Sequence, residues 1–129
     1  MKEEDQKKDE SVFLSEWISD VRTCDKAIIV EGTSDKRALA FFEIKNIFTL
    51  RRPLYLVCEE IAYKFKDAII LTDFDRKGKE LYGKLNHELS QLGVRIDRRF
   101  REELFKETKL SQIEGLIRYW KRCSINKEL

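Results

Sequence analysis

The sequence predicts an α/β protein with a mainly parallel sheet of about four strands flanked by helices. Two short apolar runs, AIIV at 27–30 and AIIL at 68–71, are each followed by turn residues and then by a helical pattern. Runs this short are typical of buried parallel strands rather than helices. Strands that alternate with helices along the chain favour right-handed crossover connections, and therefore a parallel sheet.

The first part of the chain predicts a tail, a helix and the first strand. Residues 1–10 (MKEEDQKKDE) have no apolar period and are expected to form a disordered charged tail, which leaves 11–129 as a single domain. Apolar residues from Val12 to Val21 recur at helical spacing, with Ser11 as the expected cap. We expect this helix to pack on the sheet, with a dimer surface as the alternative.

The following elements alternate in the order that a crossover fold requires. We expect strands at about 27–31, 46–50, 68–72 and 94–96, and helices at about 35–44, 53–65 and 77–91, the last one ending at Gly93. Residues 98–122 read as mostly helical, with a break near Leu110 and Ser111. In the C-terminal stretch, arginines at 95, 98, 99 and 101 are interleaved with acids, which favours a salt-bridged helix face.

Composition excludes several classes of protein. Charged residues make up 39% of the 129 residues, but the formal net charge is only +2, so the chain is no polycation. The three cysteines have no C-x-x-C spacing and the chain has one histidine, which argues against zinc. No apolar run approaches the roughly 18 residues of a membrane span, and the N-terminus does not resemble a signal peptide. We expect a cytoplasmic protein with no membrane partner.

Acidic residues follow the two apolar runs directly. Glu31 and Gly32 end the first run, and Asp73 and Asp75 follow the second. Parallel strands deliver such residues to the carboxyl edge of the sheet, where open α/β folds bind ligands. Three carboxylates gathered there would need a cation, and hard oxygen ligands suit Mg²⁺ or Mn²⁺. The alternative is turn chemistry, since Asp residues commonly cap helices and form turns.

These residues carry a resemblance to a known family. The stretches VEGTSDKRALAFF (30–42) and ILTDFDRKGKEL (70–81) resemble the Toprim domain of primases, topoisomerases and ribosomal-RNA maturation nucleases. Glu31, Gly32, Asp73 and Asp75 match the family's two acidic motifs, and Asp35 and Gly78 match neighbouring positions. The resemblance covers residues 26 to about 98, most of the chain, and is closest to small stand-alone Toprim proteins.

The resemblance implies a division of labour among these residues. Asp73 and Asp75 would hold Mg²⁺, with Mn²⁺ as a substitute, while Glu31 would act as general acid or base and assist in metal binding. Asp35 would support the metal, although a charge favoured by the helix dipole is an equal alternative. Gly32 and Gly78 would let the backbone approach a phosphate or make a tight turn. Glu114 is a weaker candidate for an additional acid.

Basic residues near these motifs are candidate phosphate contacts. Arg76, Lys77 and Lys79 follow the acidic pair at a helix start, where they oppose the dipole and are poor structural choices. Arg51 and Arg52 follow another strand at the same edge. A solvated surface is the alternative in both places. Lys36 and Arg37 lie on the first helix of the motif, where surface is the default.

The size of the chain narrows the function that the resemblance implies. A chain of 129 residues has no room for the further domains of a topoisomerase or a full primase, and no P-loop sequence is present. We expect Mg²⁺-dependent cleavage of a phosphodiester in nucleic acid, with RNA preferred over DNA. The alternative is a non-catalytic module that binds metal and nucleic acid, or a subunit of a larger complex; a homodimer is also compatible with the sequence.

Overall fold

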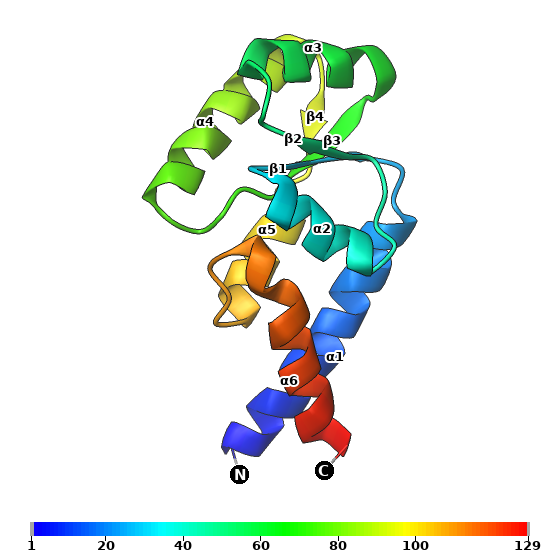
Figure 1. Ribbon diagram of the computed structural model, residues 1–129, viewed down its shortest axis with the longest axis vertical. Coiled ribbons are helices and arrows are strands. Elements are labelled where there is room, and N and C mark those ends of the chain that lie inside the picture. The colour runs from blue at the N-terminus through cyan, green and yellow to red at the C-terminus, as the bar shows by residue number, and fades with distance from the viewer. Residues whose placement is uncertain (1, 129) are drawn as a thin grey trace.

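The computed structural model describes the backbone of residues 2–128 and the side chains of residues 10–124. It confirms an α/β fold whose four strands form one parallel sheet flanked by helices (Figure 1). The strands are β1 (Ala27–Val30), β2 (Ile47–Thr49), β3 (Asp67–Ile70) and β4 (Arg95–Ile96). The helices are α1 (Lys2–Thr23), α2 (Thr33–Phe41), α3 (Leu54–Lys64), α4 (Arg76–Gln91), α5 (Arg99–Glu107), the 3₁₀ turn η1 (Ile113–Gly115) and α6 (Leu116–Glu128).

The order of the strands determines where a site can form. The sheet runs β2-β1-β3-β4, so the chain moves outward from β1 to β2 and then returns to the other side of β1 to lay down β3. Strands β1 and β3 are therefore neighbours at the point where the winding reverses. Ile29 lies opposite Ile70, and the Leu71 amide donates to the Ile29 carbonyl at 2.7 Å, which brings both strands to their ends together. Crevices at such reversal points are the usual ligand sites of open α/β sheets.

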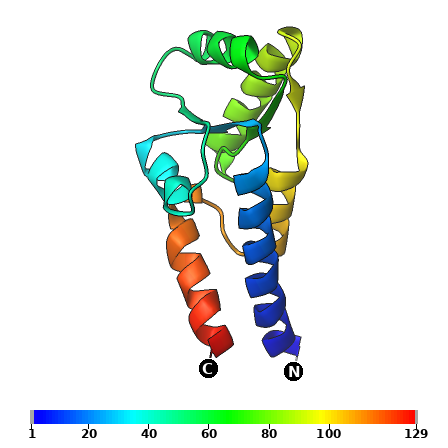
Figure 2. The same cartoon turned by 90° about the vertical axis from the view of Figure 1, so that its right-hand side faces the viewer.

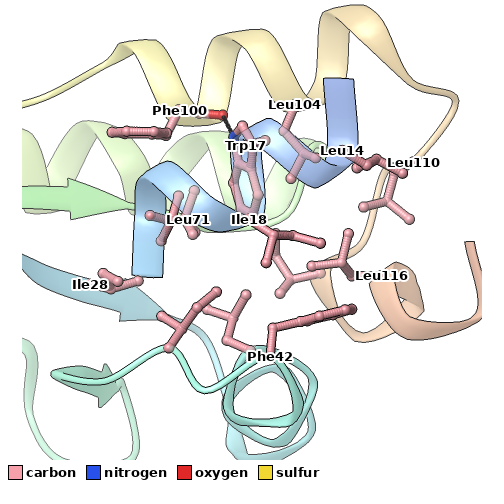
Figure 3. Close-up of a cluster of buried hydrophobic side chains, with 14 of the residues drawn as sticks. Leu14, Trp17, Ile18, Ile28, Phe42, Leu71, Phe100, Leu104, Leu110 and Leu116 are labelled. Atoms are coloured by element: carbon pink, nitrogen blue, oxygen red, sulfur yellow. Dashed lines mark hydrogen bonds between the residues drawn. The ribbon is translucent and has the colours of Figure 1, made fainter. Parts of the chain in front are cut away.

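The two faces of the sheet bury two separate hydrophobic clusters, because successive residues of a strand point to opposite faces. Ile28 and Ile69 face the first cluster, together with apolar residues of α1, α2, α5 and α6 (Figure 3). Ile29 and Ile70 face the second cluster, which is completed by α3 and α4. The sheet is thus a shared wall between two layers of helices (Figures 1 and 2).

Helix α1 forms one wall of the first cluster and lies beside α6, so that both termini lie at the same end of the molecule (Figure 2). Leu14 is fully buried, and the buried Trp17 indole donates to the Phe100 carbonyl at 2.8 Å. The helix begins at Lys2, so residues 2–10 are helical where the sequence predicts a disordered tail. Lys, Glu and Gln are good helix formers, and they extend the helix beyond its apolar stripe. Ser11 consequently lies inside the helix and is buried, rather than acting as its cap.

The remaining boundaries differ from the predicted ones by a few residues at most. Gly93 ends α4 at a φ of +85°, as predicted. The break predicted near Leu110 and Ser111 is present, because α5 ends at Glu107 and an irregular segment leads through η1 into α6. Two aromatic side chains, those of Phe41 and Tyr63, are 51% and 91% exposed. Among the described residues, no helix is both long enough and apolar enough to cross a bilayer.

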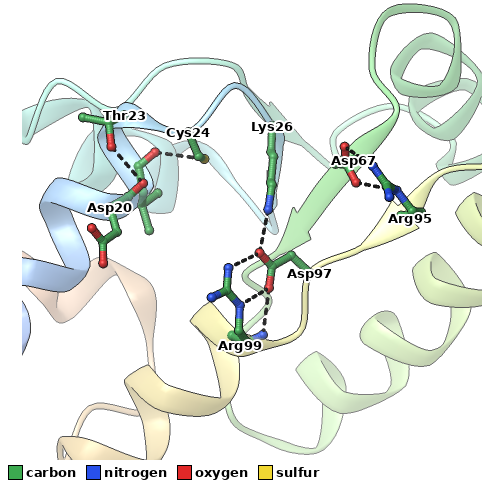
Figure 4. Close-up of polar contacts among 9 residues, drawn as sticks. Asp20, Thr23, Cys24, Lys26, Asp67, Arg95, Asp97 and Arg99 are labelled. Carbon is green, nitrogen blue, oxygen red and sulfur yellow. Dashed lines mark hydrogen bonds and ion pairs between the residues drawn. The ribbon is translucent and has the colours of Figure 1, made fainter.

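Two separate groups of ion pairs lie near β4 (Figure 4). Asp97, just after β4, binds Lys26 at 2.7 Å and Arg99 at 3.0 Å. Arg95 pairs with Asp67 at 2.9 Å. The predicted salt bridges of this stretch are therefore present at Arg95 and Arg99, although they join strands and loops rather than residues of one helix face.

Candidate metal and phosphate site

The sheet brings the two predicted acidic motifs together at the reversal point. The Glu31 side chain, at the end of β1, reaches across to the loop after β3, where its Oε2 accepts a hydrogen bond from the Asp73 amide at 2.8 Å. This contact joins residues that are 42 positions apart in the chain. Glu31 and Asp73 are partly buried, whereas Asp75 is exposed. The placement expected for the two motifs is thus what the fold produces.

Asp35 and Asp75 each accept a hydrogen bond at the start of a helix. Asp35 is 7% exposed, and its Oδ2 accepts from the Gly32 amide at 3.0 Å at the start of α2. Asp75 is the N-cap of α4 and accepts from the Gly78 amide at 2.8 Å. Helix capping, the alternative that the sequence left open for Asp75, is therefore present. Asp35 lies in the first turn of α2, where the helix dipole favours its charge, as its own alternative had it. A cap uses one carboxylate oxygen, so it does not by itself exclude a second role for the other.

Gly78 is required by the close packing of the loop that holds Asp73. A Cβ added at residue 78 would lie 1.9 Å from the Asp73 carbonyl oxygen, a distance that no side chain can tolerate. The Thr72 hydroxyl also donates to the Gly78 carbonyl at 2.7 Å. The loop therefore folds back onto the first turn of α4, and Gly78 allows this close backbone approach. Gly32 has open space where its Cβ would lie, so its predicted approach to a phosphate stays a prediction.

The segment before α6 also contributes to this site. The Ile113 amide, at the start of η1, donates to Asp73 Oδ1 at 2.9 Å, and the Phe74 amide donates to the Ser111 carbonyl at 2.8 Å. The C-terminal region thereby helps to fix the Asp73 side chain. Glu114, the weak candidate of the sequence analysis, is the next residue along and is exposed.

Burial and mutual repulsion make this edge unfavourable for negative charge. Burial raises the pKa of Asp73 to about 6, a rise that the Ile113 hydrogen bond opposes. The charges of Asp35, Glu31 and Asp75 raise it further. The pKa of Asp35 is also raised, first by burial and then by the charges of Glu31 and Glu114. The carboxylates therefore repel one another. A cation bound among them would relieve this repulsion.

Arg101 lies behind the site, which the sequence did not predict. It was expected on a salt-bridged helix face, yet it is 8% exposed. Its guanidinium donates to the Thr72 carbonyl at 2.9 Å and to the Asp73 carbonyl at 2.8 Å. Its position in the sequence could have indicated this burial. Residue 101 lies three residues before the buried Leu104, and residues three apart share one face of a helix. Arg101 therefore supports the acidic loop from behind instead of facing solvent.

The predicted phosphate-binding residues have different surroundings. Arg76, Lys77 and Lys79 are exposed at the start of α4; Arg76 is 3.8 Å from Glu80, and the Lys79 ammonium lies 4.4 Å from the centre of the Phe74 ring. The Arg51 guanidinium donates to the Thr33 hydroxyl at 3.2 Å, beside the Gly32 turn.

Arg52 instead pairs with Glu60 on α3, which occupies its guanidinium. Arg52 is consequently the least available of the predicted phosphate contacts, while Arg51 remains beside the acidic edge.

The carboxylate oxygens at this edge suit Mg²⁺ better than an ion whose ligands all come from the protein. Within the described residues, no three His, Cys, Asp or Glu side chains converge as a preformed set of ligands. Mg²⁺, however, is usually held by one or two carboxylates together with waters and substrate phosphates. The carboxylates of Asp73, Asp75 and Glu31 are hard oxygen donors fixed by backbone amides, which is how protein ligands are commonly oriented.

Comparisons with known proteins give related chains and one related structure. A UPF0292 protein of Methanocaldococcus jannaschii is 34% identical over 110 residues, which covers 81% of this chain and 82% of that protein. A UPF0292 protein of Pyrococcus abyssi is 36% identical over 111 residues, with 84% of each chain covered. A solved structure described as a putative protein from Aquifex aeolicus matches with a TM-score of 0.74 and 34% identity, over 78% of this chain and 95% of that chain. No protein-family model matches the sequence.

Proposed function

This chain belongs to the UPF0292 family, and we propose that it is a Toprim-like, Mg²⁺-dependent nuclease that cleaves phosphodiesters in nucleic acid, with RNA preferred over DNA. The observation that carries the proposal is the contact between Glu31 and the Asp73 amide, which joins the two acidic motifs at the reversal point of the sheet. The resemblance of residues 30–42 and 70–81 to the Toprim motifs supports the same site.

In this proposal the acidic residues divide the work. Asp73 and Asp75 hold the ion, with Glu31 and Asp35 as the neighbouring carboxylates, and Mn²⁺ can replace Mg²⁺. When bound, the ion neutralises phosphate charge and stabilises the developing charge on oxygen. Glu31 moves the proton, since its Oε1 makes no hydrogen bond within the described part of the chain while Oε2 is held by Asp73. The exposed Arg76, Lys77, Lys79 and Arg51 bind the flanking phosphates of the strand.

The test is cleavage of labelled structured RNA, single-stranded RNA and plasmid DNA with Mg²⁺, Mn²⁺ or chelator. Asp73→Asn, Asp75→Asn and Glu31→Gln keep an oxygen that can accept the existing backbone hydrogen bonds, so the fold should persist. We expect each to lower cleavage by about 100-fold or more. The matched control is Asp67→Asn at the opposite end of β3, which should cleave normally. Full activity in the Asp73 and Asp75 variants would refute the proposal.

A second candidate function is a module that binds metal and nucleic acid without cleaving, alone or as a subunit of a larger complex. The specific observation in its favour is that the four acidic side chains each accept a backbone hydrogen bond, which a purely structural edge would also show. Binding of RNA that depends on salt and metal, with no product formed by the wild type, would select this candidate.

A further inference from the structure

A cleft of about 710 Å³ lies between α2 and the η1–α6 segment, beside the acidic edge. Ser34 and Ala38 line it from α2, and Gln112, Gly115 and Ile117 line it from the other side. Helix α2 packs directly on η1 and on α6, which fixes the two walls relative to each other (Figures 1 and 2). The cleft is distinct from the basic turn of α4, because it belongs to the other layer of helices.

The charge of the cleft is strongly positive for a protein that is nearly neutral overall. Arg37, Arg118, Lys121 and Arg122 line it, against the single acid Glu114, while the whole chain carries a net charge of only +2. The four cations are exposed, and none of them forms an ion pair with the side chains of residues 10–124. Cations gathered in one cleft favour a polyanion as its occupant.

The cleft leads to the acidic site at one end. Ser34 precedes Asp35, and Glu114 follows Ile113, whose amide binds Asp73. A chain lying in the cleft would therefore continue towards the acidic edge.

An exposed aromatic ring lies beside the same cleft. The Lys121 ammonium is 5.7 Å from the centre of the Phe41 ring, and that ring packs edge-on against Trp120 with 51% of Phe41 exposed. A cationic groove with an aromatic ring at its side is the usual arrangement for single-stranded nucleic acid, where phosphates meet cations and bases stack on rings. A cleft of this volume is of the size that takes a small-molecule ligand, so it admits a short stretch of one strand rather than a double helix.

We propose that this cleft is the binding track for single-stranded nucleic acid, with Arg37, Arg118 and Lys121 as phosphate contacts that lead the strand to the acidic edge. The inference rests on the proposed function for the fate of the strand at that edge, whereas binding in the cleft requires no cleavage. RNA and DNA share the phosphate chemistry that the cleft recognises, so both are arms of the test.

The experiment measures binding without cleavage. Fluorescence anisotropy of labelled single-stranded RNA and DNA, with duplexes as competitors, is recorded in chelator from 50 to 300 mM salt. The triple variant Arg37→Gln, Arg118→Gln, Lys121→Gln is compared with a control triple variant that removes the same charge elsewhere on the exposed surface, Lys45→Gln, Lys84→Gln, Lys106→Gln. We expect the cleft variant to bind at least about tenfold more weakly, with a salt slope smaller by about 2, from roughly 0.7 per lost contact on a single strand.

Three results would overturn the cleft proposal: no binding by the wild type, equal losses in the two triple variants, or duplexes that compete better than single strands. The experiments also distinguish a failure of the cleft proposal from a failure of the proposed nuclease activity. If the cleft variant loses binding but the wild type never cleaves with Mg²⁺, the track stands and the nuclease fails. If the wild type cleaves and the cleft variant cleaves with unchanged KM, the nuclease stands and the track fails.

Discussion

Gly78 shows how a single residue determines the geometry of the candidate site. A methyl group at this position would meet the Asp73 carbonyl oxygen at 1.9 Å, and the obstructing atom is backbone that cannot rotate away. We expect Gly78→Ala to destabilise the fold by about 2 kcal/mol or more, because overpacking displaces the loop. Thermal or urea unfolding measures this loss, and any nuclease activity should fall with it since Asp73 moves.

The control for this prediction lies in the same helix. Gly83 has nothing within 4 Å of the position its Cβ would occupy, and it is exposed in the interior of α4. Gly83→Ala should therefore leave stability unchanged or raise it by up to about 1 kcal/mol, because alanine is the better helix former. If the two alanine variants were equally stable, steric contact with the Asp73 carbonyl would not be the reason for a glycine at 78.

At the level of elements, Asp97 ties the end of β4 to the residue before β1 and to the start of α5. Its side chain is 10% exposed and binds Lys26 and Arg99. The hydrogen bonds from Arg99 hold the pKa of Asp97 far below its usual range; burial acts against this lowering and Lys26 supports it. Since the pKa is lowered in the folded state, the stabilisation is complete above the unfolded pKa of about 4 and is lost as the pH falls below it.

We therefore expect Asp97→Asn to lower the free energy of unfolding by about 1–3 kcal/mol at pH 7, and the difference from wild type to shrink between pH 4 and pH 2. Urea midpoints at a series of pH values measure it. The control is Asp67→Asn, which removes a pair with the 79% exposed Arg95 and should cost less than about 1 kcal/mol. A difference that stays constant down to pH 2 would contradict the linkage.

The elements also show what the sequence could and could not predict. The two central strands were predictable because four consecutive apolar residues between turn signals are typical of a buried parallel strand. The position of the acids followed, because parallel strands end at the same edge of the sheet. The burial of Arg101 was not predictable, because a charged residue among charged neighbours is usually exposed. Its burial depends on hydrogen bonds to the carbonyls of Thr72 and Asp73, which lie far away in the sequence. The Ile113 contact was equally hidden, since it depends on how a segment 40 residues away returns to the site.

The cleft between α2 and α6 belongs to the same class of feature. Its cations come from two segments about 80 residues apart, and only the packing of the helices brings them together. Arg37 was expected on the surface, and residues 118–122 were expected only to be helical. Local patterns predict elements and strand ends, whereas groove charge is a property of the assembled fold.

For the whole molecule, the shared sheet makes one cooperative unit out of two hydrophobic clusters. Each central strand contributes side chains to both clusters, so neither layer of helices can detach without exposing the other face of the sheet. Leu14 is fully buried in the first cluster and Leu85 in the second. Both tryptophans, Trp17 and Trp120, belong to the first cluster, so their fluorescence reports that layer alone.

We expect Leu14→Ala and Leu85→Ala each to lower the free energy of unfolding by about 2–5 kcal/mol. In both variants, tryptophan fluorescence and far-ultraviolet circular dichroism should give one coincident urea transition, because Leu85 destabilises the fluorescent layer through the sheet. The control Val12→Ala, at a position that is 45% exposed in α1, should change stability by about 0.5 kcal/mol or less. A Leu85→Ala protein whose fluorescence transition stayed at the wild-type midpoint while its circular dichroism transition moved would show that the two layers unfold separately. In that case, the Asp73 loop would keep only its contacts with Arg101 and η1, which belong to the first layer, and would lose those with α4.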